Sequence, residues 1–565
     1  MNSLAVTAVV LVWFVLMYKL YGSFIVKKLV QPDDTRQTPA HTHEDDVDFV
    51  PAKTYLLWGN HFSSIAGAGP IIGPILAVSL FGWGYTVLWV ALGAVFLGAV
   101  HDTLSLMISV RHDGKGMSEL AGMLLGPTMR YAFAALVYFM LMLLVTVFMV
   151  SVAQALVNMP ALVIPTFGLV GVAIVMGLAV HRLHANEVIV SALGILTAYA
   201  LIWVGYAFPL SLPASLGPKG VMAVWCLIIT AYCLLAADAP MWLLLQPRDF
   251  ISSVKLLVGM ALGFAGILFI HPVLSAPFGP ESFAPQGKPV WPILFIMVAC
   301  GAISGFHSLV ASGTTARQLS RESDGKIIAF GGMITEGALA LLVTMLVAGG
   351  LKWGSAPAGV TGDAANLYFQ TALAKNWIVA FGHGFGHLVG ALHIPLVTAP
   401  IAALLGAVMV KSFILTTLDT GTRLGRYLIT ETFGQRYPIL QKRAVASLLM
   451  LAPAFALAVT NAYGNVWKLF GTANQLLAAV ALITVSVFLV KEKKPRAYTL
   501  VPALFMIATT LCALLWEMFH PEGGYLVGAK PELLLGGVAL VLTGLGLGVA
   551  LRGGKELVTK GENKN

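Results

Sequence analysis

Six ionisable residues lie within long apolar runs of this sequence: His101, Asp102, Asp238, His307, Glu336 and Lys411. A charged side chain at the centre of a membrane helix costs about 2.5–3.5 kcal/mol on insertion scales, so each needs a reason to be there. Most lie ten residues from a basic residue that would mark one membrane edge; these pairs are His101 and Arg111, Asp238 and Arg248, His307 and Arg317, and Glu336 and Lys326. Ten helical residues rise about 15 Å, half of a hydrocarbon core of about 30 Å. The spacing therefore predicts titratable groups from several helices at one depth.

Carboxylates and histidines that meet inside a membrane are suited to carrying protons or coupling ions. Asp102, Asp238 and Glu336 are the expected proton carriers, and His101 adjoins the first of them. Lys411 lies twelve residues before Arg423, at a similar depth, and is the expected partner of one carboxylate. The alternative is that these groups form hydrogen bonds and ion pairs that only hold helices together, and for any single residue this interpretation is equally good. Their shared depth favours a substrate and proton pathway for the set.

The element that must position these groups is residues 58–74, WGNHFSSIAGAGPIIGP, which open an apolar segment and then interrupt it. Proline removes a backbone donor and clashes with the preceding turn, and a freed backbone group inside a membrane is tolerated only where protein or water satisfies it. We therefore expect a discontinuous helix whose break forms part of a binding site. Gly67, Gly69 and Pro70 are the expected substrate-binding residues, because a half-helix that begins at Pro70 directs its free amides at a substrate carboxylate.

A second interruption is predicted at residues 238–240, where Asp238 and Pro240 lie in the apolar run CLLAADAPMWLLL. It falls five crossings after the first and starts from the opposite side, which is the pattern of two inverted five-helix repeats. The inference depends on topology alone, since the halves share no visible similarity. Residues 300–315, CGAISGFHSLVASGTT, add hydroxyls and small side chains, and Ser304 and His307 are expected to complete the pocket. Close helix packing would explain the glycines of this segment but not its histidine.

The composition excludes a soluble protein. The 565 residues are 58% hydrophobic and 10% charged, with a mean hydropathy of +0.86, whereas globular chains carry about 25% charged residues. About 15 apolar runs of near 20 residues predict an all-α polytopic membrane protein. The net charge of +9 does not indicate nucleic acid, because cytoplasmic loops of membrane proteins are rich in Lys and Arg. The four cysteines lie in apolar runs without a CxxC pair, so we expect neither disulfides nor a bound metal.

The basic residues predict the orientation. If the N-terminus is outside and the C-terminus cytoplasmic, 26 of the 34 Lys and Arg residues fall in cytoplasmic segments and 5 in external ones. The expected organisation is an N-terminal transmembrane helix with a polar loop at residues 1–54, a transporter core with inverted repeats at residues 55–430, and accessory transmembrane helices with a cytoplasmic tail at residues 431–565. Asp419 and Arg423 lie near the inner mouth with i,i+4 spacing and are candidate gating residues, although a local ion pair at a helix end is at least as good an explanation.

Several motifs in order resemble those of the carbon starvation protein family (CstA type), a family of peptide and pyruvate transporters. They lie between about residues 20 and 490 and read HFSSIAGAGPIIGP, GAVHDTLSLMISVRHDGKG, ACGAISGFHSLVASGTTARQL, LTTLDTGTRLGRY and WKLFGTANQLLAA. The resemblance implies a bacterial inner-membrane protein that takes up pyruvate or peptides with protons. It also implies the five-plus-five fold of amino acid–polyamine–cation transporters (APC or LeuT-like). His101 stands in GAVHD where other members often carry GAVQD, so its proton chemistry can differ.

The expected function is secondary active import of a small carboxylate-bearing nutrient, pyruvate or a short peptide, around a site at the membrane midplane. The expected partners are this substrate and the lipid bilayer; protons are favoured over Na⁺ as the coupling ion, and no cofactor is expected. A passive channel or a nutrient sensor is the alternative. An intramembrane enzyme is disfavoured, because Ala302 breaks the resemblance of GAISG to a protease loop and no HExxH motif occurs. His383 and His387 have metal-ligand spacing but no carboxylate at a useful distance.

Overall fold

The computed structural model describes residues 1–45, 48–240, 242–280, 282, 284–460 and 463–562, and every regular element in these ranges is a helix. Short π-helical and 3₁₀ turns extend or link the α-helices. The α-helices are α1 (Ser3–Met17), α2 (Ser23–Ile25), α3 (Pro39–Thr42), α4 (Thr54–Ile65), α5 (Gly69–Gly93), α6 (Ala99–Val110), α7 (Met117–Leu125), α8 (Pro127–Asn158), α9 (Val163–His181), α10 (Glu187–Ala207), α11 (Gly217–Asp238), α12 (Leu245–Ile270), α13 (Val290–Met297), α14 (Gly305–Val310), α15 (Gly331–Gly349), α16 (Gly362–Ala365), α17 (Phe369–Lys375), α18 (Trp377–Gly390), α19 (Ala399–Phe433), α20 (Arg443–Val459), α21 (Tyr463–Lys491), α22 (Ala497–Phe519) and α23 (Leu533–Glu562).

Twelve helices in the described ranges are long and apolar enough to cross a membrane, which agrees with the predicted all-helical polytopic class. The number is lower than the fifteen predicted crossings because several apolar segments are interrupted or short. Residues 69–110 count as one span, although Gly82 has a non-helical φ of 77° and ψ of 169°. Trp83 and Gly84 donate their backbone N–H groups to Pro277 and Phe278, which holds the chain in this turn. The helices α13, α14 and α20 are each shorter than a full span.

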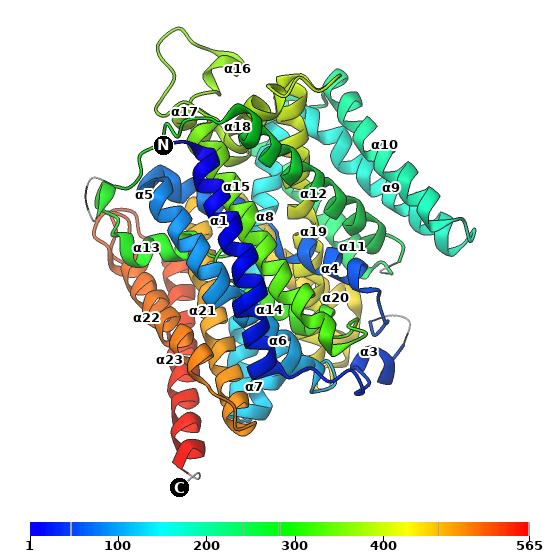
Figure 1. Ribbon diagram of the computed structural model, residues 1–565, viewed down its shortest axis with the longest axis vertical. Helices are drawn as coiled ribbons and strands as arrows, with labels where there is room; N and C mark the ends of the chain where they lie inside the picture. The colour runs from blue at the N-terminus through cyan, green and yellow to red at the C-terminus, as the bar shows by residue number, and fades with distance from the viewer. Residues whose placement is uncertain (46–47, 241, 281, 283, 461–462, 563–565) are drawn as a thin grey trace.

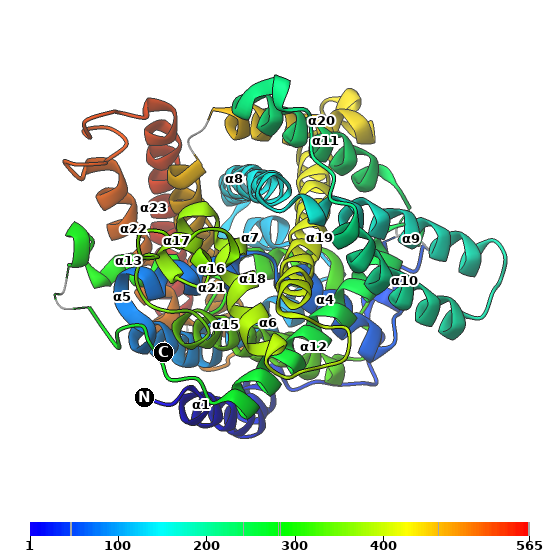
Figure 2. The ribbon, with the colours of Figure 1, turned by 90° about the horizontal axis from the view of Figure 1, so that it is seen from above.

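The most apolar segments of α8, α19 and α21 are almost completely buried, whereas those of α1 and α10 are mostly exposed. Figures 1 and 2 show the reason: α8, α19, α15, α6 and α21 lie in the interior, the α9–α10 pair lies at one side, and α22 and α23 lie at the opposite side. The two chain ends lie at opposite ends of the molecule (Figure 1). The buried helices therefore form a core that the peripheral helices separate from lipid.

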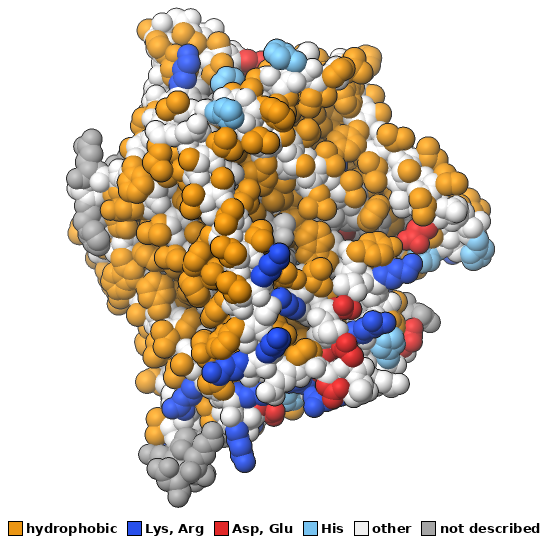
Figure 3. All heavy atoms as spheres, in the orientation of Figure 1, with side chains coloured by type: hydrophobic (Ala, Val, Ile, Leu, Met, Phe, Trp, Pro, Cys, Tyr) orange, Lys and Arg blue, Asp and Glu red, His pale blue; other side chains and the backbone are white. Residues whose placement is uncertain are grey.

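The surface is that of a membrane protein. Figure 3 shows hydrophobic side chains over most of one face, and the visible Lys and Arg side chains gather mainly toward the end at which the C-terminus lies. Large apolar side chains are exposed on the peripheral helices, among them Leu193, Leu196 and Phe269. Exposed apolar area of this extent has no counterpart on a monomeric soluble protein and is suited to contact with lipid.

The helix within residues 58–74 is interrupted, as its Gly and Pro content predicts. α4 ends at Ile65 and α5 begins at Gly69, so the break comprises residues 66–68. Gly67 lies within this break and Pro70 in the first turn of the outgoing helix α5. The break is buried, with Ala66 and Ala68 both inaccessible to solvent.

The predicted second interruption at residues 238–240 is wrong. α11 ends at Asp238 and α12 begins at Leu245, so this stretch joins two helices. Ala239, which precedes Pro240, is extended, as the proline ring requires of its neighbour, and the Arg423 guanidinium donates to the Ala239 carbonyl at 2.7 Å. The second interruption lies instead at residues 298–304, between α13 and α14. The indole of Trp89 donates to the Val298 carbonyl there at 3.0 Å.

Candidate functional site

The two interruptions lie against each other in the core. Gly69, the first residue of α5, is so close to Cys300 in the second break that a Cβ atom at Gly69 would overlap the thiol and lie 2.5 Å from the Cys300 Cβ. Only glycine permits this approach, which explains one of the glycines that interrupt the first helix. On its other side the first break is close to α19, since a Cβ at Gly67 would lie 2.6 Å from the Thr417 hydroxyl.

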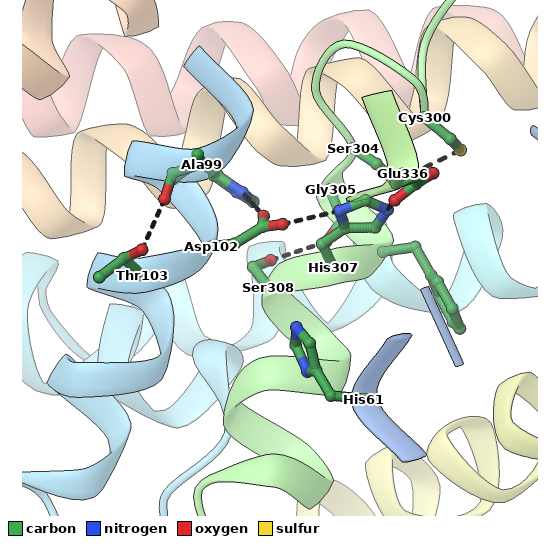
Figure 4. Close-up of polar contacts among 12 residues, drawn as sticks. His61, Ala99, Asp102, Thr103, Cys300, Ser304, Gly305, His307, Ser308 and Glu336 are labelled. Atoms are coloured by element: carbon green, nitrogen blue, oxygen red, sulfur yellow. Dashed lines mark hydrogen bonds and ion pairs between the residues drawn. The ribbon is translucent and has the colours of Figure 1, made fainter. Parts of the chain in front are cut away.

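Beside the second break, three helices bring titratable groups together (Figure 4). Asp102 of α6 is fully buried; its Oδ1 lies 2.7 Å from Nδ1 of His101, and its Oδ2 lies 2.9 Å from Nδ1 of His307 on α14. The other ring nitrogen of His307, Nε2, lies 3.2 Å from Oε2 of Glu336 on α15. The structure thus brings together four of the residues that the depth count placed at one level.

His307 therefore lies between two carboxylates. Its Nδ1 is hydrogen-bonded to Asp102, whereas its Nε2 lies within ion-pair distance of Glu336 without a hydrogen bond. A ring with a proton on both nitrogens is an imidazolium, so the proton can reside on Asp102, His307 or Glu336. Buried groups arranged in this way can take up, hold and release a proton.

His61 of α4 lies beside this cluster and is not among the residues that the depth count selects. Its Nδ1 lies 2.8 Å from the Thr315 hydroxyl, and its Nε2 has no hydrogen-bond partner among the residues that the structure describes. It is close enough to Asp102 and His307 for their charges to interact with it. The signal in the sequence is the histidine within WGNHFSS, five residues before the first break.

The second break is stabilised by Asn474 of α21, a residue from the segment predicted to be accessory. Its Oδ1 accepts the backbone N–H of Phe306 at 2.8 Å, and its Nδ2 donates to the Ser304 hydroxyl at 3.0 Å. The neighbouring Gln475 donates to the Phe295 carbonyl at 2.5 Å. The signal that could have indicated this role is the polar pair Asn474–Gln475 within the otherwise apolar motif WKLFGTANQLLAA.

Two cavities lie among these helices, and the first of them reaches the breaks. The first, here termed the α13–α21 cavity, has a volume of about 220 Å³, and Gly69 and Cys300 form part of its lining. It lies between α13, α21 and α22, on the side of the molecule that holds Lys288 and the α22–α23 loop. The second, the α4–α12 cavity, has a volume of about 580 Å³ and lies between α4, α9 and the start of α12.

A broken helix pair beside a buried cluster of carboxylates and histidines is the architecture expected of a membrane transporter, and the sequence comparisons agree. The family model described as "Carbon starvation protein CstA" matches residues 2–513. The chain belongs to the carbon starvation protein CstA family. The resemblance of its motifs to that family is thereby confirmed.

Curated relatives of this CstA family member are bacterial transporters. The chain is 33% identical to the peptide transporter CstA of Bacillus subtilis, over 93% of both chains. It is 32% identical to the pyruvate/proton symporter BtsT of Escherichia coli, over 90% of this chain and 80% of the relative. It is 31% identical to the peptide transporter CstA of Escherichia coli, over 92% and 82%. The chain is thus a multi-pass membrane transporter, and the prediction that it is not an enzyme is confirmed.

The remaining predicted site residues of this CstA family member lie elsewhere. Asp238, at the end of α11, is half-buried and accepts a hydrogen bond from Ser447 at 3.1 Å. Lys411 donates to the Thr166 hydroxyl and to the Leu162 carbonyl, and no carboxylate in the described ranges forms an ion pair with it. The expected pairing of Lys411 with a carboxylate is therefore wrong: equal depth does not fix the direction in which a side chain leaves its helix.

The i,i+4 ion pair of Asp419 and Arg423, which was the alternative to a gating role, is absent. Asp419 accepts instead from Arg248 and from the Tyr232 hydroxyl, and Arg423 donates to backbone carbonyls at the end of α11. Arg248 also pairs with Asp249, at 2.8 Å. Arg248 is fully buried, so it does not mark a membrane edge as assumed in the depth count. The adjacent Arg–Asp in QPRDF is the signal for this buried network.

Replacing Asn474 by leucine is expected to weaken the second break. The change keeps the side-chain volume but leaves the Phe306 N–H and the Ser304 hydroxyl without their partner, at a cost of about 1–3 kcal/mol for each buried group. We expect a lower thermal midpoint in detergent and reduced uptake. The control is Thr484→Val on the same helix, whose hydroxyl donates only to its own helix, at Val480. Equal stability of the two variants would contradict the role of Asn474.

Replacing Gly69 by alanine is expected to reduce uptake strongly, because the added Cβ would overlap Cys300 where the breaks meet. Overpacking of this kind costs about 1–3 kcal/mol. The double variant Gly69→Ala, Cys300→Gly removes the overlapping atoms and is expected to regain part of the lost uptake. Uptake of the single variant at the rate of the unmodified protein would show that the close approach is not required.

Proposed function

We propose that this chain is a secondary active transporter that imports a small carboxylate-bearing nutrient, pyruvate or a short peptide, together with protons. The observation that carries the proposal is His307 held between the carboxylates of Asp102 and Glu336 beside two interrupted helices. The named activities of the relatives support it, since two are peptide transporters and one a pyruvate/proton symporter.

Protons are the better coupling ion on chemical grounds. A Na⁺ site is built from oxygen ligands, as hard cations prefer. At this cluster both Asp102 oxygens already face imidazole nitrogens, and Glu336 forms an ion pair with a ring nitrogen of His307. Imidazole and carboxylate together exchange protons near neutral pH. We therefore assign His101, Asp102, His307 and Glu336 to proton coupling, with His61 as a further member.

We further propose fifteen crossings and a core of two inverted five-helix repeats. The first repeat comprises α4 with residues 69–81, residues 83–110, α8, α11 and α12; the second comprises α13 with α14, α15, α19, α20 and α21. Each repeat then begins with an interrupted helix, and the two run in opposite directions. The α9–α10 pair is an insertion at the periphery, as its position in Figure 2 supports. The core would thus extend to α21, beyond the boundary at residue 430 that the sequence suggests.

The proposed orientation places the N-terminus outside and the C-terminus in the cytoplasm. The gathering of Lys and Arg toward the C-terminal end supports it. The α13–α21 cavity then opens outward and the α4–α12 cavity inward. Substrate would enter from outside and meet the first break at Gly67. There the N-terminal end of α5, which begins at Gly69 and Pro70, would face the substrate carboxylate; Gly69 can supply a backbone N–H and Ser304 a hydroxyl, whereas Pro70 has no N–H to donate. Movement of the proton within the cluster would bias α6, α14 and α15 between outward-facing and inward-facing arrangements.

The buried pair of Arg248 and Asp419 is the proposed inner gate. It lies between α12 and α19, and its neighbour Asp249 lines the α4–α12 cavity. Arg423 ties α19 to the end of α11, so it would move with the gate. Lys411 has a positioning role in this scheme through its contact with Thr166 on α9.

The test is accumulation of labelled pyruvate or L-alanyl-L-alanine in liposomes that contain the purified full-length protein. A transporter coupled to protons concentrates its substrate when the outside is more acidic, and stops when an ionophore removes the gradient. A passive channel would only equalise the substrate concentrations. A nutrient sensor would bind the substrate without moving it.

A further inference from the structure

The α13–α21 cavity has a lining that the proposed transport mechanism does not use. Its charged side chains come from α21, α22, the loop after α22 and the segment before α13. These are two acids, Glu517 and Glu522, and two lysines, Lys288 and Lys468. Lys468 and Glu522 are exposed at the mouth, whereas Glu517 is 6% exposed. The cavity thus offers both signs of charge within a small volume.

Glu517 is the deepest of these charged groups and is only partly satisfied. Its Oε1 accepts the Thr472 hydroxyl at 3.0 Å, while its Oε2 is buried without a hydrogen-bond partner among the described residues. Lys468 lies near enough for its charge to act on Glu517, but the two form no ion pair. Instead, the Lys468 ammonium donates to the Asn465 side chain at 3.1 Å. A buried carboxylate oxygen left in this state is costly unless a ligand supplies a donor.

The two lysines lie close to one another. Lys288 is half-buried, and burial, followed by the nearby Lys468 ammonium group, lowers the pKa of Lys288 below its ordinary value. Two ammonium groups that repel one another favour an anion between them. A carboxylate is the group that fits this end of the cavity.

The walls between the charged groups are apolar. They include the aromatic side chains of Trp467, Phe470 and Trp516, together with Ile293 and Ile296 of α13. Such walls bury an aliphatic or aromatic side chain of a ligand. The lining therefore matches a ligand with one ammonium group, one carboxylate and apolar groups between or beside them.

We propose that the α13–α21 cavity is a binding site for a small zwitterion, an amino acid or short peptide with free termini, whose ammonium group binds Glu517 and whose carboxylate binds Lys468 and Lys288. The C-terminal helices α21 and α22 would then select the substrate before it reaches the breaks at Gly69 and Cys300. A simple monocarboxylate would occupy the lysine end and leave Glu517 without a donor. This proposal rests on the proposed function, which places the cavity on the path of the substrate.

The test measures equilibrium binding to the purified full-length protein in detergent, without any gradient. The probes are L-alanyl-L-alanine, its N-acetyl derivative, which lacks the ammonium group, its C-terminal amide, which lacks the carboxylate, and pyruvate. We expect the free dipeptide to bind at least about tenfold more tightly than either derivative, the factor expected of one charge-assisted hydrogen bond. Glu517→Gln should remove the preference over the N-acetyl form, and Lys468→Gln the preference over the amide.

Lys352→Gln, an external lysine away from the cavity, is the matched control and should keep both preferences. Equal binding of the dipeptide and both derivatives, absence of dipeptide binding, or unchanged preferences in both cavity variants would overturn the proposal. If Glu517→Gln does not yield folded protein, the test is whether Lys468→Gln loses the preference for the free dipeptide over its C-terminal amide. Because no transport is measured, a protein that binds with these preferences but does not accumulate substrate would contradict the proposed function and leave this site standing.

Discussion

Asp102→Asn is expected to abolish proton-driven accumulation of substrate in liposomes. Both Asp102 oxygens accept from histidine nitrogens. In asparagine the amide NH₂ group would face one of these histidine N–H groups, so two donors would oppose each other, and the amide cannot bind and release a proton as a carboxylate does. Leaving a buried imidazole N–H unpaired costs about 1–3 kcal/mol, which corresponds to a factor of about 5–150 in an equilibrium constant. The readout is accumulation under an inward proton gradient, compared with exchange of substrate at equal pH.

Exchange at equal pH should persist in Asp102→Asn, because the breaks and the cavities remain. Thr103→Val is the matched control on the same helix: the Thr103 hydroxyl donates only to the Ala99 carbonyl of its own helix, so accumulation should continue. Accumulation by Asp102→Asn at the rate of the unmodified protein would exclude this carboxylate from coupling. Loss of both accumulation and exchange in a folded protein would indicate a role in binding instead.

Arg248→Met is expected to destabilise the protein more than any other single change discussed above. Arg248 lies between Asp249 and Asp419, and removing it leaves two buried carboxylates uncompensated. Breaking a buried ion pair from one side costs about 3–5 kcal/mol. We expect a large fall in the yield of monodisperse protein and in its thermal midpoint in detergent.

Lys255→Met provides the control on the same helix, two turns after Arg248. The Lys255 ammonium is also buried, but it donates to the Ser412 hydroxyl at 2.7 Å and forms no ion pair with a carboxylate of the described residues. Replacing it by an apolar side chain of similar length leaves no buried carboxylate without a partner. The free energy of unfolding should therefore fall by less than about 1 kcal/mol or rise. Equal losses of stability in the two variants would show that the ion pairs of Arg248 do not stabilise the fold.

The sequence predicts the first helix break because its cause is local. Gly67, Gly69 and Pro70 interrupt a helix by their own backbone properties. The second break has a weaker local cause, since residues 298–304 contain Gly301 but no proline and continue an apolar run. It is stabilised by groups distant in the sequence, the indole of Trp89 and the amide of Asn474. Hydropathy and local composition do not reveal these distant contacts. Because of Pro240, the second interruption was predicted at residues 238–240, which lie at the end of α11.

Depth counting brought Asp102, His307 and Glu336 to one level, and in the structure they lie in contact. The same count failed for Lys411, whose side chain leaves α19 toward α9 and away from the cluster. The count also treated Arg248 as a residue at the membrane edge, whereas its side chain is fully buried. A one-dimensional sequence fixes the height of a residue along its helix approximately, but the direction of its side chain depends on the packing of neighbouring helices. Sequence alone therefore does not show which of the residues at one depth point into the same site.

The most direct test of the account is proton movement itself. Purified protein is placed in liposomes that contain a pH-sensitive dye, with no initial gradient, and pyruvate or L-alanyl-L-alanine is added outside. The account predicts that substrate addition acidifies the lumen at a rate that depends on substrate concentration, and that Asp102→Asn does not. Entry of labelled substrate without acidification, at the same rate in both proteins, would contradict coupling through Asp102, His307 and Glu336.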